Sequence, residues 1–69
     1  MYTKYARLRD KKGYTDFKVC TLTGIAPTTM SDWKKRTENR KEGEKVPYIS
    51  VDKLQKIAKL FKVKIEDLI

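Results

Sequence analysis

The segment over residues 15–36 places the tightest constraint on how this chain folds. Two short stretches in it have apolar residues at helical spacing, and Gly24 separates them, with Pro27 shortly after. Glycine adopts a left-handed backbone at little cost, and proline suits the first turn of a helix, where its missing N–H is not needed. The segment therefore predicts two helices, over 16–22 and 27–36, joined by a sharp turn.

The apolar residues of this segment predict how the two helices pack. Met30 and Trp33 lie three residues apart, so they share one face of the second helix. We expect this pair to pack against Val19, Cys20 and Ile25. The opposite face of the second helix then stays exposed, and it carries Thr28, Ser31, Asp32 and Lys35. This arrangement is typical of a helix-turn-helix motif.

The rest of the chain predicts three more helices and one charged loop. Basic residues before a glycine indicate a first helix over 3–12, and an apolar stripe with helical spacing indicates a fourth over 51–61. A last short helix is expected over 65–69, and the charged run over 37–47 is expected to be a loop. The sequence thus predicts a single all-α domain over 1–69, built as a compact bundle of five helices.

The charge distribution predicts an acidic partner. The chain has 17 Lys and Arg residues against 9 Asp and Glu, which gives a net charge of +8. Residues 1–13 carry +4 and residues 34–45 carry +3, whereas residues 14–33 carry −1. Positive charge therefore brackets the polar face of the second helix, as it would if phosphate contacts flanked a base-reading surface. A basic surface that is merely solvated is the alternative interpretation.

Several classes of function are disfavoured by what the sequence contains. With no histidine and one cysteine, a zinc site lacks ligands, and we expect no metal or cofactor. No glycine-rich phosphate loop or activated nucleophile is present, so we expect no enzyme, and no small-molecule effector site is evident. The lone cysteine and the lack of a signal peptide or a long apolar stretch predict a cytoplasmic protein with no membrane association.

Three stretches together resemble a known family: LRDKKGYTD, TGIAPTTMSDWK and PYISVDKLQKIAKLFKVKIEDLI. They are similar to the end of the first helix, the turn with its recognition helix, and the closing helices of lambda-repressor-like, Cro-type helix-turn-helix regulators. The resemblance is strongest to small phage and mobile-element members from Gram-positive bacteria. It implies a sequence-specific transcriptional regulator, of the phage or prophage repressor type, whose third helix enters the major groove of double-stranded DNA.

The resemblance also implies sites. It places base-reading positions at Pro27, Thr28 and Asp32, and a phosphate contact at Thr29. With the outward face added, the predicted base-reading set is Pro27, Thr28, Ser31, Asp32 and Lys35. The predicted phosphate-contacting set is Thr15, Lys18, Thr29, Lys34, Arg36, Arg40 and Lys41. Because the three family positions hold no Arg, Gln or Asn, we expect modest direct readout, supplemented by Lys35, Arg36 and DNA shape.

Some features depart from the family or leave alternatives open. The family usually has alanine at position 20, serine at position 26 and a short glycine-containing loop after Trp33, where this chain has a long charged run. That run is either a positive flap over the DNA backbone or a mobile insertion. A homodimer, in solution or only on DNA, would have to use apolar groups such as Ile65, Leu68 and Ile69.

Two other functions fit the same fold. The chain could be a protein-interaction module of a phage or mobile element, or a recombination-directionality factor. A protein-interaction module is distinguished by salt, because binding through several phosphates weakens steeply with ionic strength whereas an apolar protein interface does not.

Overall fold

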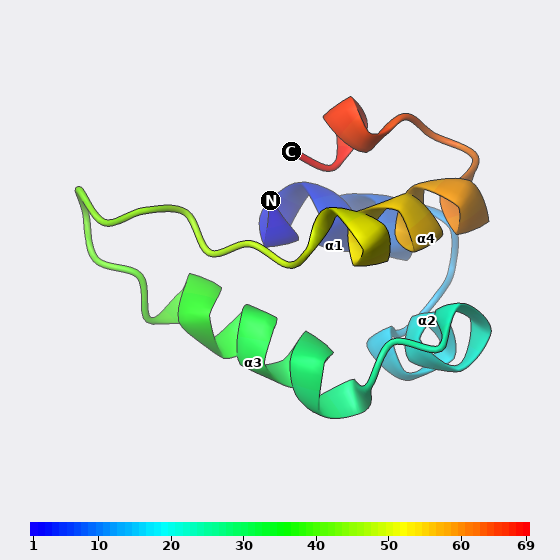
Figure 1. The fold of residues 1–69 in the computed structure, drawn as a ribbon, viewed down its shortest axis with the longest axis horizontal. Helices are drawn as coiled ribbons and strands as arrows, with labels where there is room; N and C mark the ends of the chain where they lie inside the picture. The colour runs from blue at the N-terminus through cyan, green and yellow to red at the C-terminus, as the bar shows by residue number, and fades with distance from the viewer.

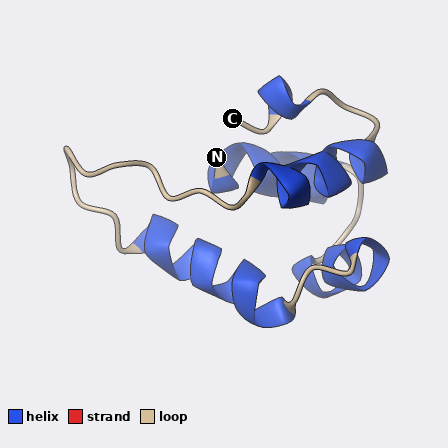
Figure 2. Ribbon diagram, in the orientation of Figure 1, coloured by secondary structure: helices blue, strands red, loops and turns tan.

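Four α-helices and a short 3₁₀ helix make up the chain. The computed structural model describes all residues, 1–69, and contains no β-strand (Figure 2). In chain order the elements are α1 (Tyr2–Lys11), α2 (Asp16–Thr23), α3 (Pro27–Glu38), α4 (Val51–Phe61) and the 3₁₀ helix η1 (Ile65–Asp67) (Figure 1). The predicted all-α class is confirmed.

The prediction of a fifth α-helix over 65–69 was wrong. This segment forms η1, in which the N–H of Asp67 donates to the carbonyl of Lys64 at 3.0 Å and that of Leu68 to Ile65 at 2.8 Å. A segment this short can form few i to i−4 hydrogen bonds, so the tighter i to i−3 pattern satisfies more of its backbone. The other boundaries match the prediction or shift by one or two residues: α4 is unchanged, α1 begins at Tyr2 and α3 continues to Glu38, so the charged loop begins later.

Aromatic side chains from three helices meet in the core. Trp33 of α3 is fully buried, with its ring 5.1 Å from that of Tyr2 and 5.3 Å from that of Tyr5, both on α1. The ring of Tyr5 also stacks on Phe61 of α4 at 6.0 Å. Met30 is buried as well, so the prediction that Met30 and Trp33 share the buried face of α3 is confirmed.

The turn between α2 and α3 depends on one glycine. Gly24 has a φ of +78°, and its N–H donates to the carbonyl of Cys20 at 2.9 Å, which closes the end of α2. This left-handed backbone favours glycine over other residues. Ile25 follows and is buried, so the chain is anchored before α3 begins at Pro27.

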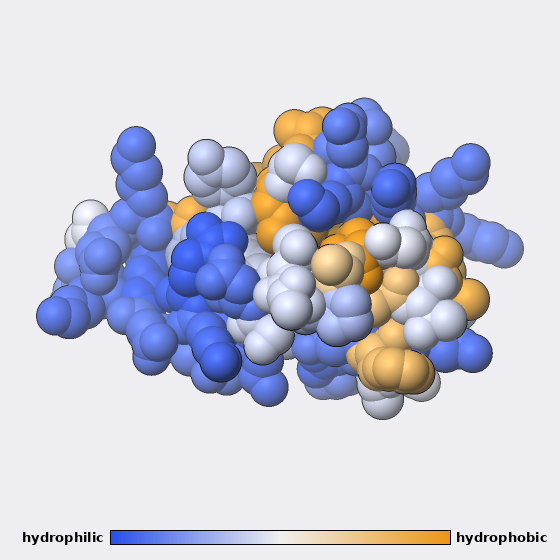
Figure 3. All heavy atoms as spheres, turned by 60° about the horizontal axis from the view of Figure 1, so that its bottom comes forward, coloured by the Kyte–Doolittle hydropathy of each residue, from blue (hydrophilic) through white to orange (hydrophobic).

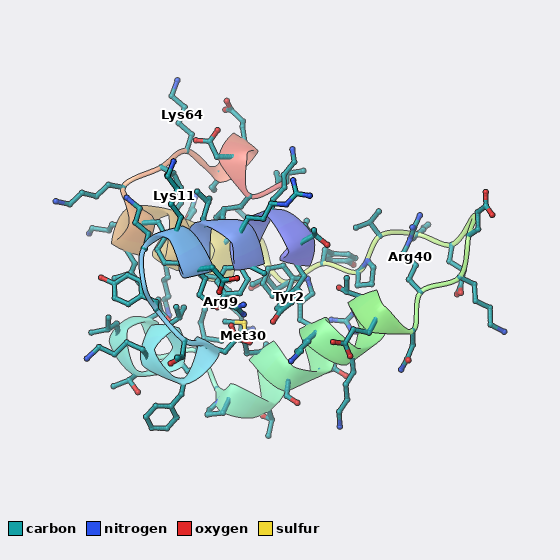
Figure 4. All side chains as sticks on the ribbon, turned by 180° about the vertical axis from the view of Figure 1, so that it is seen from behind. Tyr2, Arg9, Lys11, Met30, Arg40 and Lys64 are labelled. Atoms are coloured by element: carbon teal, nitrogen blue, oxygen red, sulfur yellow. The ribbon has the colours of Figure 1, made fainter.

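A polar cluster joins α1 to the first turn of α2. The carboxylate of Asp16 accepts hydrogen bonds from the hydroxyls of Tyr5 at 2.6 Å and Tyr2 at 2.8 Å. Arg9 donates to the same carboxylate at 2.8 Å, and it also donates to the Tyr2 hydroxyl at 3.2 Å. Tyr2 and Arg9 point from α1 into the space between the helices, close to Met30 (Figure 4).

The cluster changes the acidity of its members. Burial on its own would raise the pKa of Asp16, but the hydroxyl of Tyr5, the guanidinium of Arg9 and the hydroxyl of Tyr2 outweigh it and hold that pKa below its usual value. Burial, together with the hydrogen bond to Asp16, raises the pKa of Tyr2 to about 12. The cluster is therefore assembled with an ionised carboxylate and neutral phenols at neutral pH.

The carboxyl-terminal apolar residues differ in exposure. Leu68 is fully buried and Ile65 is half-buried, whereas Ile69 is 57% exposed. Leu68 belongs to the core because η1 folds back on α4, so it is not among the exposed apolar groups that a dimer could use.

We predict that Asp16→Asn lowers the free energy of unfolding by about 1 to 3 kcal/mol at pH 7, because three charge-assisted hydrogen bonds are weakened. A lowered pKa in the folded state means that the carboxylate stabilises the fold above the unfolded pKa, near about 3.9, and that this contribution is lost as the pH falls through the folded value. The gap between wild type and Asp16→Asn should therefore be largest at neutral pH and close in acid. Urea unfolding across pH 2 to 7 measures it.

The matched control is Asp10→Asn. Asp10 also pairs with Arg9, at 2.9 Å, but its side chain is 71% exposed, so its removal should change the free energy of unfolding by less than about 0.5 kcal/mol. Equal losses in the two variants, or a gap that does not depend on pH, would contradict the role assigned to Asp16.

Candidate nucleic-acid interface

The outward face of α3 carries the predicted base-reading residues. Met30 and Trp33 are 2% and 0% exposed, and their burial fixes the rotation of α3 about its own axis. The structure consequently brings one set of exposed side chains together on the solvent side of α3: Pro27, Thr28, Ser31, Asp32 and Lys35. That these side chains read bases stays a prediction.

The first turn of α3 leaves a hydrogen-bond donor free. Ala26 occupies the N-cap position and offers no side-chain cap, and Pro27 follows at the first helical position. The N–H of Thr29 donates to the carbonyl of Ala26 at 3.0 Å, whereas that of Thr28 has no acceptor in the structure. One exposed backbone donor at the positive end of the helix dipole therefore adjoins the outward face.

Some of the predicted phosphate contacts lie on the α2 side of this face. Thr15 caps α2 by accepting a hydrogen bond from the N–H of Lys18 at 3.1 Å, and both residues are exposed. Lys34 of α3 helps to line a hollow of about 270 Å³ between α2 and α3. Thr29 is only half-buried, so it too reaches the surface. Thr15 and Lys18 thus lie at the start of α2, and Thr29 and Lys34 lie on α3 itself.

The remaining predicted phosphate contacts lie at the other end of α3, and two of them have partners within the chain. Nε of Arg36 lies 2.9 Å from Oδ2 of Asp32, and Nη2 of Arg36 donates to the carbonyl of Tyr48 at 3.2 Å. Nε of Arg40 donates to the carbonyl of Glu44 at 2.9 Å. Lys41 is exposed. The two arginines therefore help to shape the charged loop as well as carrying charge.

The charged loop is tied to α3 at its returning end. After α3 it extends away from the helices and returns to the start of α4 (Figure 1), and Arg40 lies on it beyond the end of α3 (Figure 4). The indole N–H of Trp33 donates to the carbonyl of Pro47 at 3.2 Å, which ties the returning segment to the core. Between the loop and α3 lies a cleft of about 520 Å³, whose charged lining residues are Asp32, Lys35, Arg36, Arg40, Glu44 and Lys45.

The polarity of the surface differs between the loop end and the α2 end of the molecule. In Figure 3 the part of the molecule over the loop and the end of α3 is almost uniformly hydrophilic, whereas apolar side chains gather toward the α2 end. Phe17, which is 76% exposed, lines the hollow between α2 and α3. Sequence reasoning missed Phe17, because it lies three residues before the buried Cys20 and so shares a helix face with it.

Tyr48 was also missed. It is 64% exposed and lines the cleft beside the loop, while the next residue, Ile49, is buried. Tyr48 and Ile49 are neighbours between Pro47 and Ser50, and nothing in the sequence there separates an exposed tyrosine from a buried isoleucine.

The structure does not bring metal-ligating side chains together, and its one thiol is buried. No three side chains among His, Cys, Asp and Glu come together as metal ligands would. Burial raises the pKa of the Cys20 thiol, so it stays protonated at neutral pH. None of the helices has the length and apolar character needed to cross a membrane.

Comparisons with known proteins agree with this geometry. A family model described as the Cro/C1-type helix-turn-helix DNA-binding domain matches residues 6–69, which is nearly the whole chain. Neither a search of curated proteins nor a search of solved structures returned a match. The match covers α2, the turn at Gly24, α3 and its exposed polar face, so the chain belongs to the family of Cro/C1-type helix-turn-helix DNA-binding domains.

Proposed function

We propose that the chain is a sequence-specific DNA-binding transcriptional regulator that inserts α3 into the major groove. The observation that carries the proposal is the polar outward face of α3, which Trp33 and Met30 hold in place from the buried side. An α-helix with its side chains is about 10–12 Å wide and the major groove is about 12 Å wide, so the groove admits α3. The proposal assigns binding, and no catalysis, to this surface.

Within this proposal two sets of side chains at the interface have different roles. The side chains of Pro27, Thr28, Ser31, Asp32 and Lys35 meet base edges. Thr28 can donate or accept a hydrogen bond and can place its methyl group against that of thymine, and Asp32 can accept from cytosine N4. The phosphate contacts come from Thr15 and Lys18 at the start of α2, from Thr29, Lys34 and Arg36 on α3, and from Arg40 and Lys41 beyond the end of α3.

More specifically, we propose that the chain is a repressor encoded by a phage or prophage of Gram-positive bacteria. The resemblance of the helix-turn-helix and of the closing segments supports it. A protein-interaction module and a recombination-directionality factor are the alternatives. Any dimer would form on DNA or through exposed apolar groups such as Ile69, and it would require an operator with two-fold symmetry.

We predict that DNA binding through six to eight phosphates weakens as about the fifth to seventh power of salt concentration. Lys41→Gln should weaken binding to all sequences alike and lower that exponent by about one, because one phosphate contact is lost. Fluorescence anisotropy with a labelled random duplex, at several salt concentrations, measures both. Lys64→Gln is the control, because Lys64 is exposed on the side of the molecule away from α3 (Figure 4). An affinity that does not change with salt concentration would instead favour a protein-interaction module.

We predict that Thr28→Ala changes the sequence recovered by selection from random duplex DNA and leaves the salt exponent unchanged. The reason is that Thr28 contacts bases, which carry the sequence, and not phosphates. Sequencing of the selected pools measures the change. An inverted repeat with half-sites about one helical turn apart would indicate a dimer on DNA. If wild type enriches no sequence, the role proposed for α3 is incorrect.

A further inference from the structure

Asp32 and Arg36 form a paired unit on the outward side of α3. They lie one helical turn apart, with Nε of Arg36 2.9 Å from Oδ2 of Asp32. Both stay accessible, because the side chain of Arg36 is 46% exposed and that of Asp32 is 64% exposed. A second contact, from Nη2 of Arg36 to the carbonyl of Tyr48 at 3.2 Å, holds the guanidinium from the loop side.

The pair keeps most of its hydrogen-bonding capacity. A guanidinium has five N–H donors, and the one hydrogen bond that Arg36 donates within the chain comes from Nη2, so both donors on Nη1 stay free. On Asp32 only Oδ2 has a partner within the chain, so Oδ1 is free to accept. The unit thus presents donors beside an acceptor, in an orientation that the Tyr48 carbonyl helps to fix.

This order of groups matches one base pair. In the major groove a G·C pair presents two acceptors, guanine N7 and O6, followed by a donor, cytosine N4. An A·T pair presents an acceptor, a donor and an acceptor, followed by the thymine methyl group. Two donors of Arg36 followed by Oδ1 of Asp32 complement the first pattern along its whole length and conflict with the second at its centre.

A phosphate contact for Arg36 is less favourable. The carboxylate beside it makes the pair neutral overall, and that carboxylate would repel a phosphate oxygen placed on the same guanidinium. The neighbouring cleft offers another cation with no carboxylate partner, Lys45, for the DNA backbone. A neutral base edge is therefore the better ligand for the pair.

We propose that Asp32 and Arg36 read one G·C base pair as a unit, with Arg36 on the guanine and Asp32 on the paired cytosine. This inference rests on the proposed function, since it requires α3 to lie in the major groove. It moves Arg36 from the phosphate-contacting set to the base-reading set, and it makes the two residues act on the same position of the operator.

The test begins with selection from random duplex DNA using wild type, Arg36→Ala, Arg36→Lys and Asp32→Ala, with Lys64→Ala as the control. Competition titrations then use duplexes in which each G·C pair of the wild-type motif is changed singly. We expect Arg36→Ala and Asp32→Ala to lose preference at the same position, by about tenfold for Arg36→Ala, and Lys64→Ala to lose none. Arg36→Lys should lose part of the preference, since lysine lacks the planar fork.

A modified base tests whether Arg36 reads the guanine or only supports the loop. Replacing the guanine at that position by 7-deazaguanine removes the N7 acceptor, so it should weaken binding by wild type and leave binding by Arg36→Ala unchanged. A change in the loop alone would not produce this difference between the two proteins.

The outcomes separate the inference from the proposed function. If wild type selects a motif but both variants keep its preferences, or the two variants affect different positions, the paired readout is overturned while sequence-specific binding stands. Uniform weakening by Arg36→Ala with a lower salt exponent would likewise overturn it and return Arg36 to the phosphates. If wild type selects no motif, the proposed function fails and the inference fails with it.

Discussion

The burial of Trp33 is the interaction on which the presentation of α3 depends. The indole is enclosed by Tyr2 and Tyr5 of α1, and its N–H is satisfied by the carbonyl of Pro47. Truncating a buried tryptophan costs about 3 to 5 kcal/mol, so a rotation of α3 that exposed Trp33 would cost a large part of the stability of a domain of this size. Because side chains on a helix have fixed relative directions, this one contact decides which groups face outward.

The other helix of the motif is held by polar contacts. α2 has only eight residues, which is too short to be stable alone, and just two of them, Val19 and Cys20, are buried. The carboxylate of Asp16 compensates by joining the first turn of α2 to Tyr2, Tyr5 and Arg9 of α1. The tyrosines that hold Asp16 also enclose Trp33, so α1 positions both helices of the helix-turn-helix motif at once.

Local signals in the sequence were sufficient for the motif itself. The conformational freedom of Gly24, the position of Pro27 and the spacing of Met30 and Trp33 are properties of neighbouring residues, and they predicted the turn and the buried face. The type of the last helix was not predictable in this way, because a short α-helix and a 3₁₀ helix at Ile65–Asp67 differ by only one or two backbone hydrogen bonds.

Contacts between distant segments could not be predicted from the sequence. The Asp16 cluster joins residues on two helices and exists only once α1 crosses α2, so no local pattern reports it. For the candidate site, helical spacing placed the outward face of α3, but the ion pair between Asp32 and Arg36 was not predicted, although their four-residue separation allows one. The carbonyl of Tyr48, which also holds Arg36, comes from a chain reversal that no residue pattern specified.

The loop therefore belongs to the candidate interface and not only to the connection between α3 and α4. Trp33 fixes the returning segment through Pro47, and the next residue, Tyr48, fixes Arg36. The core contact that orients α3 thus also sets the position of a side chain on its outward side. Since Arg36 and Asp32 are both exposed, changing either removes little buried surface, so these positions can vary while the fold keeps its stability. In the proposed readout, the loop would hold an arginine in place on α3, whose other outward side chains include few groups for reading purines.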